Sequence, residues 1–542
     1  MVSNLTDNPT PTPEKLKFVR PTRTATICGL TLLILLYTLY AFRWVSIPTR
    51  KKETSSKEHE TVSYPSLLLR WARNPHLTIA DLLYQIGLDS DAALVKVRIG
   101  LRGNVYLIRS SEYTTFVQNK SKYLTMNPVQ DLLVTTGHLN KKDAAKIRHN
   151  RGSRKVPNAY GEMLKSFHQS LSPSDEYYRI IRGFVAKYGE KIMQLQSDGN
   201  TTIDLYKWIQ FSFSRAVSYS IWGETSPYYL DTALIRDWWN FHNASPVILF
   251  SLLPAFLFPG ARFGMLCRER IFKSTTEYYR AIRESDDTST VPHRILQYME
   301  AGKKWGFDDE ALARIDLSRT LGFFEPPIDA SYGLAVSIFS HPDLLSKIRA
   351  ELEHILMRSS DGQAIVFHAH AVRTSCPLFL SCFYENARMI GTAFSIRDIA
   401  EDFILDSVSL KKGDLAIMCG TPVNHNPLYW DEPTIFKGDR FIGITQPENE
   451  MTRTYRAFGG GAGICGGRNI APNLVMAVGS LLLAFDVVPE EGEGKWAIPD
   501  VKNARVPEAV TPPRGVGSTM VTIKPREGYE NVKWDFCESC DA

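Results

Sequence analysis

The stretch FGGGAGICGGR, from Phe458 to Arg468, is the most informative part of this sequence. It places one cysteine, Cys465, in a glycine-rich loop directly before a predicted helix. Glycine permits positive φ and lets a flat ligand approach the backbone closely. Amide groups at a helix start favour a thiolate over a thiol and can donate to its sulfur. The loop therefore predicts a thiolate that can bind iron.

Two other interpretations of this loop exist when it is taken alone. A glycine-rich loop before a helix can bind phosphate, but neither the GxxxxGK[ST] pattern nor the GxGxxG pattern is present. A structural cysteine in a flexible loop also fits the pattern. The motifs upstream of the loop decide between these interpretations.

Further motifs precede the cysteine loop in a fixed order. Glu385-Asn386-Ala387-Arg388 reads ExxR, which places the acid and the base on one helical face. Arg440 follows within FKGDRF, after the runs HNP and WDEP. With Phe, two residues, Gly, three residues, Cys, one residue and Gly in the loop, this order resembles the cytochrome P-450 family. The resemblance covers about Tyr64 to Pro525, and the FGGG and GGR style is similar to fungal secondary-metabolite enzymes.

The resemblance implies a mainly α fold with a small β portion, the cytochrome P-450 fold. It implies haem b with Cys465 as the axial ligand of the iron, and a charge network of Glu385, Arg388 and Arg440 beneath the haem. Arg397, twelve residues after Glu385, is expected to bind a haem propionate, because a guanidinium suits a carboxylate. The other residues expected to contact the cofactor are Phe458, Gly459, Gly461 and Gly467.

The sequence departs from the family pattern at two places. Gly463 stands where the family has a basic residue two positions before the cysteine. Glu325 and Pro326 stand where the family has an acid followed by threonine, whose hydroxyl helps to deliver protons. We therefore expect Glu325 to relay protons, with Asp329 in reserve. We also expect the two consecutive prolines to kink or break the helix. The side chains expected to shape the pocket are Phe323, Phe324 and Ile328.

The resemblance implies a monooxygenase that receives electrons from NADPH through a cytochrome P-450 reductase. Its substrate is expected to be an apolar small molecule such as a terpenoid, polyketide or alkaloid. One alternative is an isomerase or dehydratase that needs no reductase, because relatives lacking the threonine include such enzymes. Another alternative is a non-catalytic haem-binding protein.

Composition favours a membrane-associated enzyme over a nucleic-acid-binding protein. The net charge of the 542 residues is only +5, and basic residues gather near the N-terminus. The residues from Thr24 to Phe42 are uncharged and long enough to span a bilayer. A cleaved signal peptide is the rival interpretation, but no small-residue cleavage site follows. We expect a single-pass anchor in the endoplasmic reticulum membrane, contact with lipid, and a cytosolic catalytic domain.

The sequence therefore divides into an N-terminal flank, an anchor, a linker, a catalytic domain and a tail. Alternating apolar residues predict a hairpin over residues 93–106, followed by a helix over 111–118. Residues 157–357 are mostly helical in pattern, and a last helix is predicted over 468–483. The apolar run 247–258 is either a buried helix end or a patch that dips into the bilayer, helped by Trp238, Trp239 and Phe241. The predicted boundaries are 1–23, 24–42, 43–60, 61–525 and 526–542.

Overall fold

A computed structural model describes residues 59–537, apart from 75–76, 100–102, 119–122, 152–155, 252, 360–363, 492–494, 515–516 and 531. The predicted flank and anchor, 1–42, and nearly all of the predicted linker lie outside these residues. Across the described ranges, no helix is both long and apolar enough to cross a bilayer.

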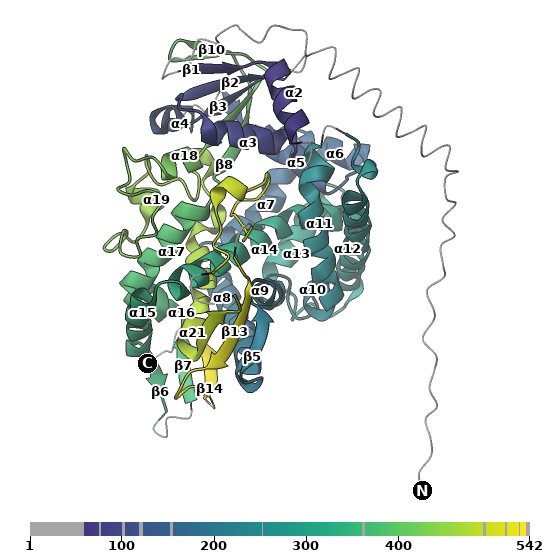
Figure 1. Cartoon of the computed structure of the whole chain (residues 1–542). Helices are drawn as coiled ribbons and strands as arrows, with labels where there is room; N and C mark the ends of the chain where they lie inside the picture. Colours follow the sequence, from purple (N-terminus) through teal and green to yellow (C-terminus); the bar gives the residue numbers. More distant parts are fainter. Residues whose placement is uncertain are drawn as a thin grey trace, which may run out of the picture. The chain divides into compact units, whose positions relative to one another are not determined.

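The described part of the chain is mainly helical, as the sequence predicts, and its short strands lie at the top and at the bottom of Figure 1. The helices of the N-terminal half are α2 (Tyr64–Arg73), α3 (Ile79–Asp89), α4 (Ser111–Gln118), α5 (Asn127–Thr136), α6 (Lys141–Arg148), α7 (Ala159–Ser170), α8 (Asp175–Ser197), α9 (Leu205–Trp222), α10 (Pro227–Leu230), α11 (Thr232–Phe250) and α12 (Pro259–Glu284). Those of the C-terminal half are α13 (His293–Lys304), α14 (Asp309–Phe339), α15 (Pro342–His354), α16 (Ala369–Ser375), α17 (Pro377–Ile390), α18 (Thr421–Asn424), α19 (Pro447–Glu450), α20 (Ala471–Val475) and α21 (Gly479–Ala484). The single-turn 3-10 helices are η2 (Ala255–Leu257), η3 (Gly461–Gly463), η4 (Gly466–Asn469), η5 (Met476–Val478) and η6 (Val501–Asn503).

A six-stranded sheet in the order β1-β2-β3-β11-β8-β4 lies with α2 and α3 at one end of the described chain (top of Figure 1). The predicted hairpin is confirmed, since β2 and β3 pair antiparallel with Val95 opposite Leu107. The strands of this sheet are β1 (His59–Val62), β2 (Leu94–Arg98), β3 (Asn104–Ile108), β4 (Leu124–Thr125), β8 (Phe394–Ile399) and β11 (Leu415–Cys419).

Three smaller sheets use the remaining strands, and one of them includes part of the predicted C-terminal tail. Strand β14 (Lys533–Cys537) pairs parallel with β7 (Ala364–His368), which pairs with β6 (Met357–Arg358). Residues after 525 therefore contribute a strand to the main body of the fold. The other strands are β5 (Thr201–Asp204), β9 (Phe403–Leu405), β10 (Val408–Leu410), β12 (Phe485–Pro489) and β13 (Met520–Pro525).

The long helix α14 passes through the centre of the helical part and organises the core. Its first turn is capped by Asp308, whose side chain accepts a hydrogen bond from the Ala311 amide. Of the expected kink or break at Pro326-Pro327, a break does not occur: α14 continues through both prolines to Phe339. Contacts with α9, α12, α17 and α20 hold the helix on several sides, so tertiary packing offsets the local cost of the prolines.

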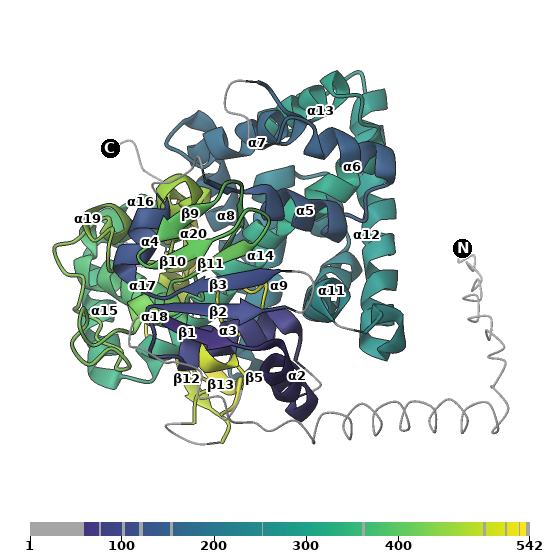
Figure 2. The same cartoon turned by 90° about the horizontal axis from the view of Figure 1, so that it is seen from above.

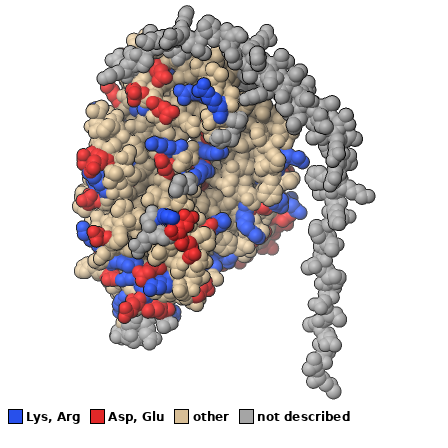
Figure 3. Space-filling view, viewed as in Figure 1, with Lys and Arg blue, Asp and Glu red and all other residues tan. Residues whose placement is uncertain are grey.

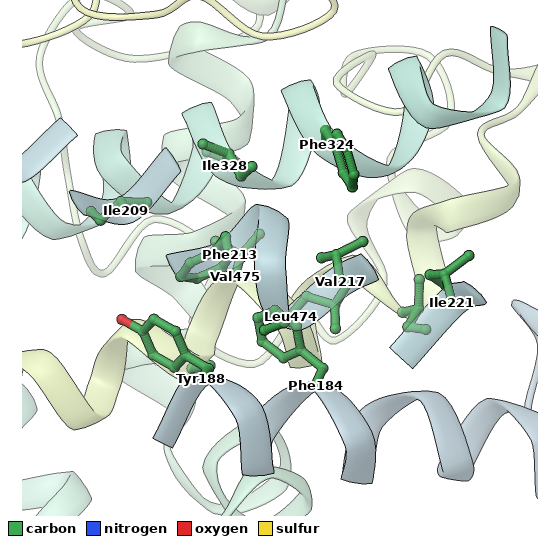
Figure 4. Close-up of a cluster of buried hydrophobic side chains, with 14 of the residues drawn as sticks. Phe184, Tyr188, Ile209, Phe213, Val217, Ile221, Phe324, Ile328, Leu474 and Val475 are labelled. Atoms are coloured by element: carbon green, nitrogen blue, oxygen red, sulfur yellow. The ribbon is translucent and has the colours of Figure 1, made fainter. Parts of the chain in front are cut away.

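One large hydrophobic cluster fills the space between α8, α9, α14 and α20 (Figure 4). Phe324 and Ile328 of α14 point into it beside Phe213 of α9, and Leu474 of α20 lies in the same cluster. The predicted final helix over 468–483 is wrong in detail, since this segment forms η4, α20, η5 and α21 in succession. Pro472, the second residue of α20, lacks an amide donor and so separates α20 from η4.

Candidate functional site

A cavity of about 500 Å³ lies between α14 and the cysteine loop. From α14 it is lined by Gly322, Phe323, Pro326, Pro327 and Ala330. The opposite side consists of Phe458, Cys465, Gly466 and Gly467 from the loop, with Ile470, Leu474 and Val475 beyond it. A second cavity of about 830 Å³ adjoins it, since both share Ala457, Phe458 and Ala509 in their walls. The arrangement places a cysteine opposite the middle of the longest helix.

Cys465 lines this cavity and is exposed to it, although protein atoms surround the residue on its other sides. Cys465 precedes η4, and its Sγ accepts a hydrogen bond of 3.3 Å from the Gly467 amide. Its own amide donates to the Phe458 carbonyl at 2.9 Å, which closes the loop. Burial raises the pKa of the Cys465 thiol, and the Gly467 amide and Arg468 only partly oppose this. The loop amides thus favour the thiolate, as the sequence predicts, but burial outweighs them, and a bound metal cation would add to their effect.

The glycines of the loop let it fold tightly against its neighbours. Gly459 and Gly461 have φ values of +74° and +58°, a region that other residues rarely adopt. A Cβ on Gly461 would lie 2.8 Å from the Cβ of Gln118 in α4. Gly461 thus contacts α4, whereas Phe458 and Gly467 line the cavity beside Cys465 and Gly459 lines the adjoining one.

Arg397 of β8 occupies the space that a side chain at position 463 would need. A Cβ built on Gly463 would lie 2.1 Å from Nη2 of Arg397. The basic residue that the family carries at position 463 is therefore sterically incompatible with Arg397 in this position. The absence of a side chain at Gly463 therefore leaves the space that the Arg397 guanidinium occupies. The cation reaches the cysteine loop from strand β8.

Arg397 is a buried cation that faces the larger cavity. Its Nη1 donates to Ser395 Oγ and to the Ile396 carbonyl, both at 2.8 Å. Burial lowers its pKa to about 10, and no carboxylate pairs with it within the part of the chain that the structure describes. A buried guanidinium without an anion is complementary to a carboxylate on a bound group. Together with Cys465 and the apolar walls, this donor set fits haem with a propionate at Arg397.

The structure brings Glu385, Arg388 and Arg440 together as the resemblance implies. Arg388 donates to both oxygens of Glu385 at 2.7 and 2.8 Å, and Arg440 Nε lies 3.0 Å from each of the same oxygens. Arg388 also donates to the carbonyls of Asn424 and Pro433 at 2.7 and 2.9 Å. Glu385 and Arg388 are fully buried, so these contacts tie α17 to the segment that leads into the cysteine loop.

Replacing Arg388 with methionine should destabilise the protein strongly. The change leaves the fully buried Glu385 carboxylate with one guanidinium instead of two, and breaking such a pair costs about 3–5 kcal/mol. Urea unfolding followed by circular dichroism measures the loss. The matched control is Arg148→Met, because Arg148 pairs with Asp131 at an exposed site, where such pairs contribute about 0–1 kcal/mol. Equal midpoints for the two variants would contradict the structural role of the network.

Glu325 does not line the cavity next to Cys465, although the sequence led us to expect it there. Its Oε1 instead accepts hydrogen bonds from the amides of Ala509 and Val510, both at 3.0 Å. These two residues line the cavity, so Glu325 holds part of the cavity wall. Burial raises the pKa of Glu325 well above its usual value, and the nearby Asp329 carboxyl raises it further.

Asp329, the reserve candidate, lies one turn further along α14 and is also buried. Its Oδ1 accepts a hydrogen bond of 2.7 Å from the Tyr206 hydroxyl, and its buried Oδ2 has no hydrogen-bond partner among the described residues. Burial raises the pKa of Asp329 as well. The two carboxyl groups thus form a buried acidic pair behind the cavity wall.

Glu325→Ala and Glu325→Gln should have different effects on stability. Alanine leaves two buried amides without an acceptor, at a cost of about 1–3 kcal/mol each, whereas glutamine keeps an acceptor oxygen. Thermal unfolding of both variants at one pH measures this difference. Equal losses of Tm would show that the two hydrogen bonds do not hold the wall.

The same variants test the raised pKa of Glu325. A folded-state pKa above the unfolded one stabilises the protein fully below the unfolded value of 4.5, and this stability is lost as pH rises toward the folded value. The Tm of the wild type should therefore decline from pH 5 to pH 8 more steeply than that of Glu325→Gln. Parallel pH profiles would contradict the assignment.

Of the three residues expected in the pocket, only Phe323 lines the cavity. Phe324 packs in the core, with its ring centroid 4.9 Å from Trp238 and 5.5 Å from Tyr228. Ile328 points to the same side, as Figure 4 shows. Residues 324 and 328 share one face of the helix, and 323, 326, 327 and 330 share another. The pocket roles expected of Phe324 and Ile328 are thus wrong, since adjacent positions on a helix face different directions.

Three parts of the cavity wall escaped the sequence reasoning. His168 of α7 lies beside the loop, since a Cβ on Gly466 would be 3.1 Å from its Cδ2. Arg319 of α14 stacks on Tyr298, with its guanidinium 3.8 Å from the ring centroid. The segment containing Ala509 and Val510 forms a further side. None of these residues belongs to a local motif, so the spacing of residues along the chain gives no indication of their position.

Comparison with known proteins identifies the family. The Cytochrome P450 family model matches residues 162–515. The chain is 28% identical over 359 residues to "Cytochrome P450 monooxygenase nodJ" of Hypoxylon pulicicidum, covering 64% of this chain and 67% of that protein. It is 25% identical over 366 residues to a "Cytochrome P450 monooxygenase" of Gibberella zeae, with the same two shares. Against "Cytochrome P450 4F6" of Rattus norvegicus it is 22% identical over 403 residues, 69% of this chain and 71% of the relative.

The residues matched by the family model include the charge network of Glu385, Arg388 and Arg440, the cysteine loop and the whole of α14. Cys465 stands at the position where the family's haem-binding cysteine is expected, and Arg397 faces the adjoining cavity. The chain therefore belongs to the cytochrome P450 family and is an oxidoreductase of the monooxygenase type.

Proposed function

We propose that this protein is a membrane-bound haem-thiolate monooxygenase that oxidises an apolar secondary metabolite, such as a terpenoid, polyketide or alkaloid. Its electrons would come from NADPH through a cytochrome P450 reductase. The observation that carries the proposal is Cys465, which lines a largely apolar cavity opposite α14. Fungal monooxygenases among the relatives support the type of enzyme.

Haem bound through a cysteine thiolate supplies O–O bond cleavage for the oxidation of a carbon centre. In this chain the thiolate of Cys465 would bind the haem iron and Arg397 would bind a propionate. Phe458 and Gly467 lie beside the cysteine in the cavity wall and would contact the cofactor. Gly459 and Gly461 would shape the loop that carries the cysteine, since both have positive φ.

The substrate would lie in the space between the cofactor and α14. Phe323, Leu132, Leu164 and Val510 make this part of the wall apolar, which favours a substrate of low polarity and excludes water. Phe323 also contacts Phe167 and Trp222, at ring-centroid distances of 6.0 and 5.9 Å. These contacts would hold the Phe323 ring in place against the substrate.

The carbon-monoxide spectrum of the reduced protein tests the haem ligand. The wild type should show the red-shifted Soret band of a thiolate complex, and Cys465→Ser should lose it together with activity. Cys267→Ser is the matched control, because Cys267 is buried in α12 and does not line the cavity. A thiolate band in Cys465→Ser, or its loss in the control, would overturn the assignment. Product formation without NADPH and a reductase would instead favour the isomerase alternative.

A second part of the proposal concerns the membrane. Five exposed apolar side chains cluster where α11 passes through η2 into α12, two helices that lie side by side in Figures 1 and 2. We define this α11–α12 patch as Leu253, Phe256, Leu257, Phe263 and Leu266, which are 41–61% exposed. Exposed apolar groups of this kind mark contact surfaces, and we propose that the patch contacts lipid.

The face seen in Figure 3 does not carry a separate basic surface that would attract the protein to a membrane. There, acidic and basic side chains lie interspersed, and wide areas carry neither. The bilayer contribution expected of Trp238, Trp239 and Phe241 is wrong, because all three are buried in the core. Location in the endoplasmic reticulum and the anchor over 24–42 stay predictions from the sequence.

The double change Phe256→Ser and Leu257→Ser should weaken lipid binding. The test uses residues 54–542, which form one compact unit, so that the predicted anchor does not hold the protein to the membrane. Co-sedimentation with phosphatidylcholine vesicles should show at least a tenfold weaker affinity, roughly the effect of losing two partly inserted apolar side chains. Leu428→Ser is the control, since Leu428 is 84% exposed in a different part of the chain. Equal binding by both variants would remove the α11–α12 patch from the proposal.

A further inference from the structure

Pro326 and Pro327 leave two backbone carbonyls of α14 without their helical donors. In an α-helix the carbonyl of each residue accepts a hydrogen bond from the amide four residues later. Proline has no amide hydrogen, so the carbonyls of Gly322 and Phe323 lose the donors that positions 326 and 327 would supply. The helix nevertheless continues on both sides, which keeps the two carbonyls in fixed positions.

The residues at both ends of each missing hydrogen bond line the cavity: Gly322, Phe323, Pro326 and Pro327. Each proline ring also crowds the carbonyl four residues earlier, and groups can insert into a helix at such a place. Between residues 322 and 330 the cavity face of α14 therefore carries polar backbone groups beside apolar side chains, while Ser318 and Arg319 line the cavity one turn earlier.

The cavity has open space beside this part of α14. A Cβ built on Gly322 would have no atom within 4 Å outside the backbone of the helix itself, so the Cβ side of this residue is open. The nearest hydroxyls on the helix are already used, since Ser318 donates to the Ile315 carbonyl and Thr320 to the Leu317 carbonyl, both at 2.7 Å. Arg319 donates through Nη2 to the Met163 carbonyl at 3.1 Å. Ser318 and Thr320 thus donate elsewhere, whereas Nη1 of Arg319 has no hydrogen-bond partner among the described residues. Gly322 is itself exposed and lines the cavity.

We propose that the carbonyls of Gly322 and Phe323 accept hydrogen bonds from a hydroxyl or N–H group of the substrate. This inference rests on the proposed function and narrows its substrate class to apolar skeletons that already carry a hydrogen-bond donor. An earlier hydroxylating, cyclising or reducing reaction must then supply the donor group. The double proline thus acts as a specificity determinant, with the backbone making the polar contact in an otherwise largely apolar pocket.

The test uses two pairs of ligands. In each pair, a methyl group in one member replaces the hydrogen of the hydrogen-bond donor in the other. Farnesol and farnesyl methyl ether have the same skeleton, and indole and 1-methylindole form a second pair. Isothermal titration calorimetry with the haem-loaded full chain should give about three- to tenfold tighter binding of the donor-bearing member, the effect of one net hydrogen bond. In the double variant Pro326→Ala, Pro327→Ala the restored amides satisfy both carbonyls, and the preference should disappear.

The control is Pro246→Ala, which restores an amide inside α11, at a residue that does not line the cavity next to Cys465. It should keep the wild-type preference. Gly322→Ala gives an independent variant in case the double change prevents folding, since a methyl group there enters the open space on the Cβ side of this residue. It should weaken farnesol binding more than binding of the ether.

The outcomes separate this inference from the proposed function. Equal wild-type affinities within both pairs, or an unchanged preference in the double variant and in Gly322→Ala, would overturn the inference and indicate water at the two carbonyls. Loss of the thiolate spectrum or of NADPH-dependent turnover in the wild type would instead contradict the proposed function. The ligand preference is measured by heat of binding, so it does not depend on turnover.

Discussion

The buried carboxylate of Glu385 is the interaction on which the rest of the site depends. It accepts hydrogen bonds from Arg388 on its own helix and from Arg440, fifty-five residues later, and it also accepts one from the Lys437 amide. Arg388 in turn binds the carbonyls of Asn424 and Pro433. An unpaired carboxylate at this depth would be very costly, so the chain between 424 and 440 must stay close to α17. This fixes the point from which the cysteine loop begins.

Helix α14 lies between the hydrophobic core and the cavity, and a short stretch of its residues contributes to both. Its one side packs Phe324 and Ile328 into the hydrophobic core, while its other side presents Gly322, Phe323, Pro326 and Pro327 to the cavity. Glu325 points to neither place and instead binds the amides of Ala509 and Val510. Core packing therefore holds the helix rigid, so its cavity side can carry two consecutive prolines. The prolines are tolerated because α14 does not depend on its own hydrogen bonds alone.

Arg397 and Gly463 show how a departure from a family pattern can be compensated in space. The guanidinium of Arg397 lies where a side chain at 463 would stand, and no carboxylate of the described residues pairs with it. A cation reaches the cysteine loop in this chain from strand β8 and not from the loop itself. The electrostatic requirement for a carboxylate-bearing cofactor can thus be met although one motif position has changed.

The sequence by itself determined the mainly helical fold and the hairpin of β2 and β3, because both follow from the periodicity of apolar residues. It also predicted Cys465, Glu385, Arg388 and Arg440 as site residues, because they belong to motifs with short spacing. Only the tertiary structure decided which face of α14 meets the cavity. It also decided that Glu325 binds the 509–510 segment and that His168 and Arg319 lie at the site. The physical reason is that these positions depend on the rotation and packing of whole helices, which the local pattern of one chain does not encode.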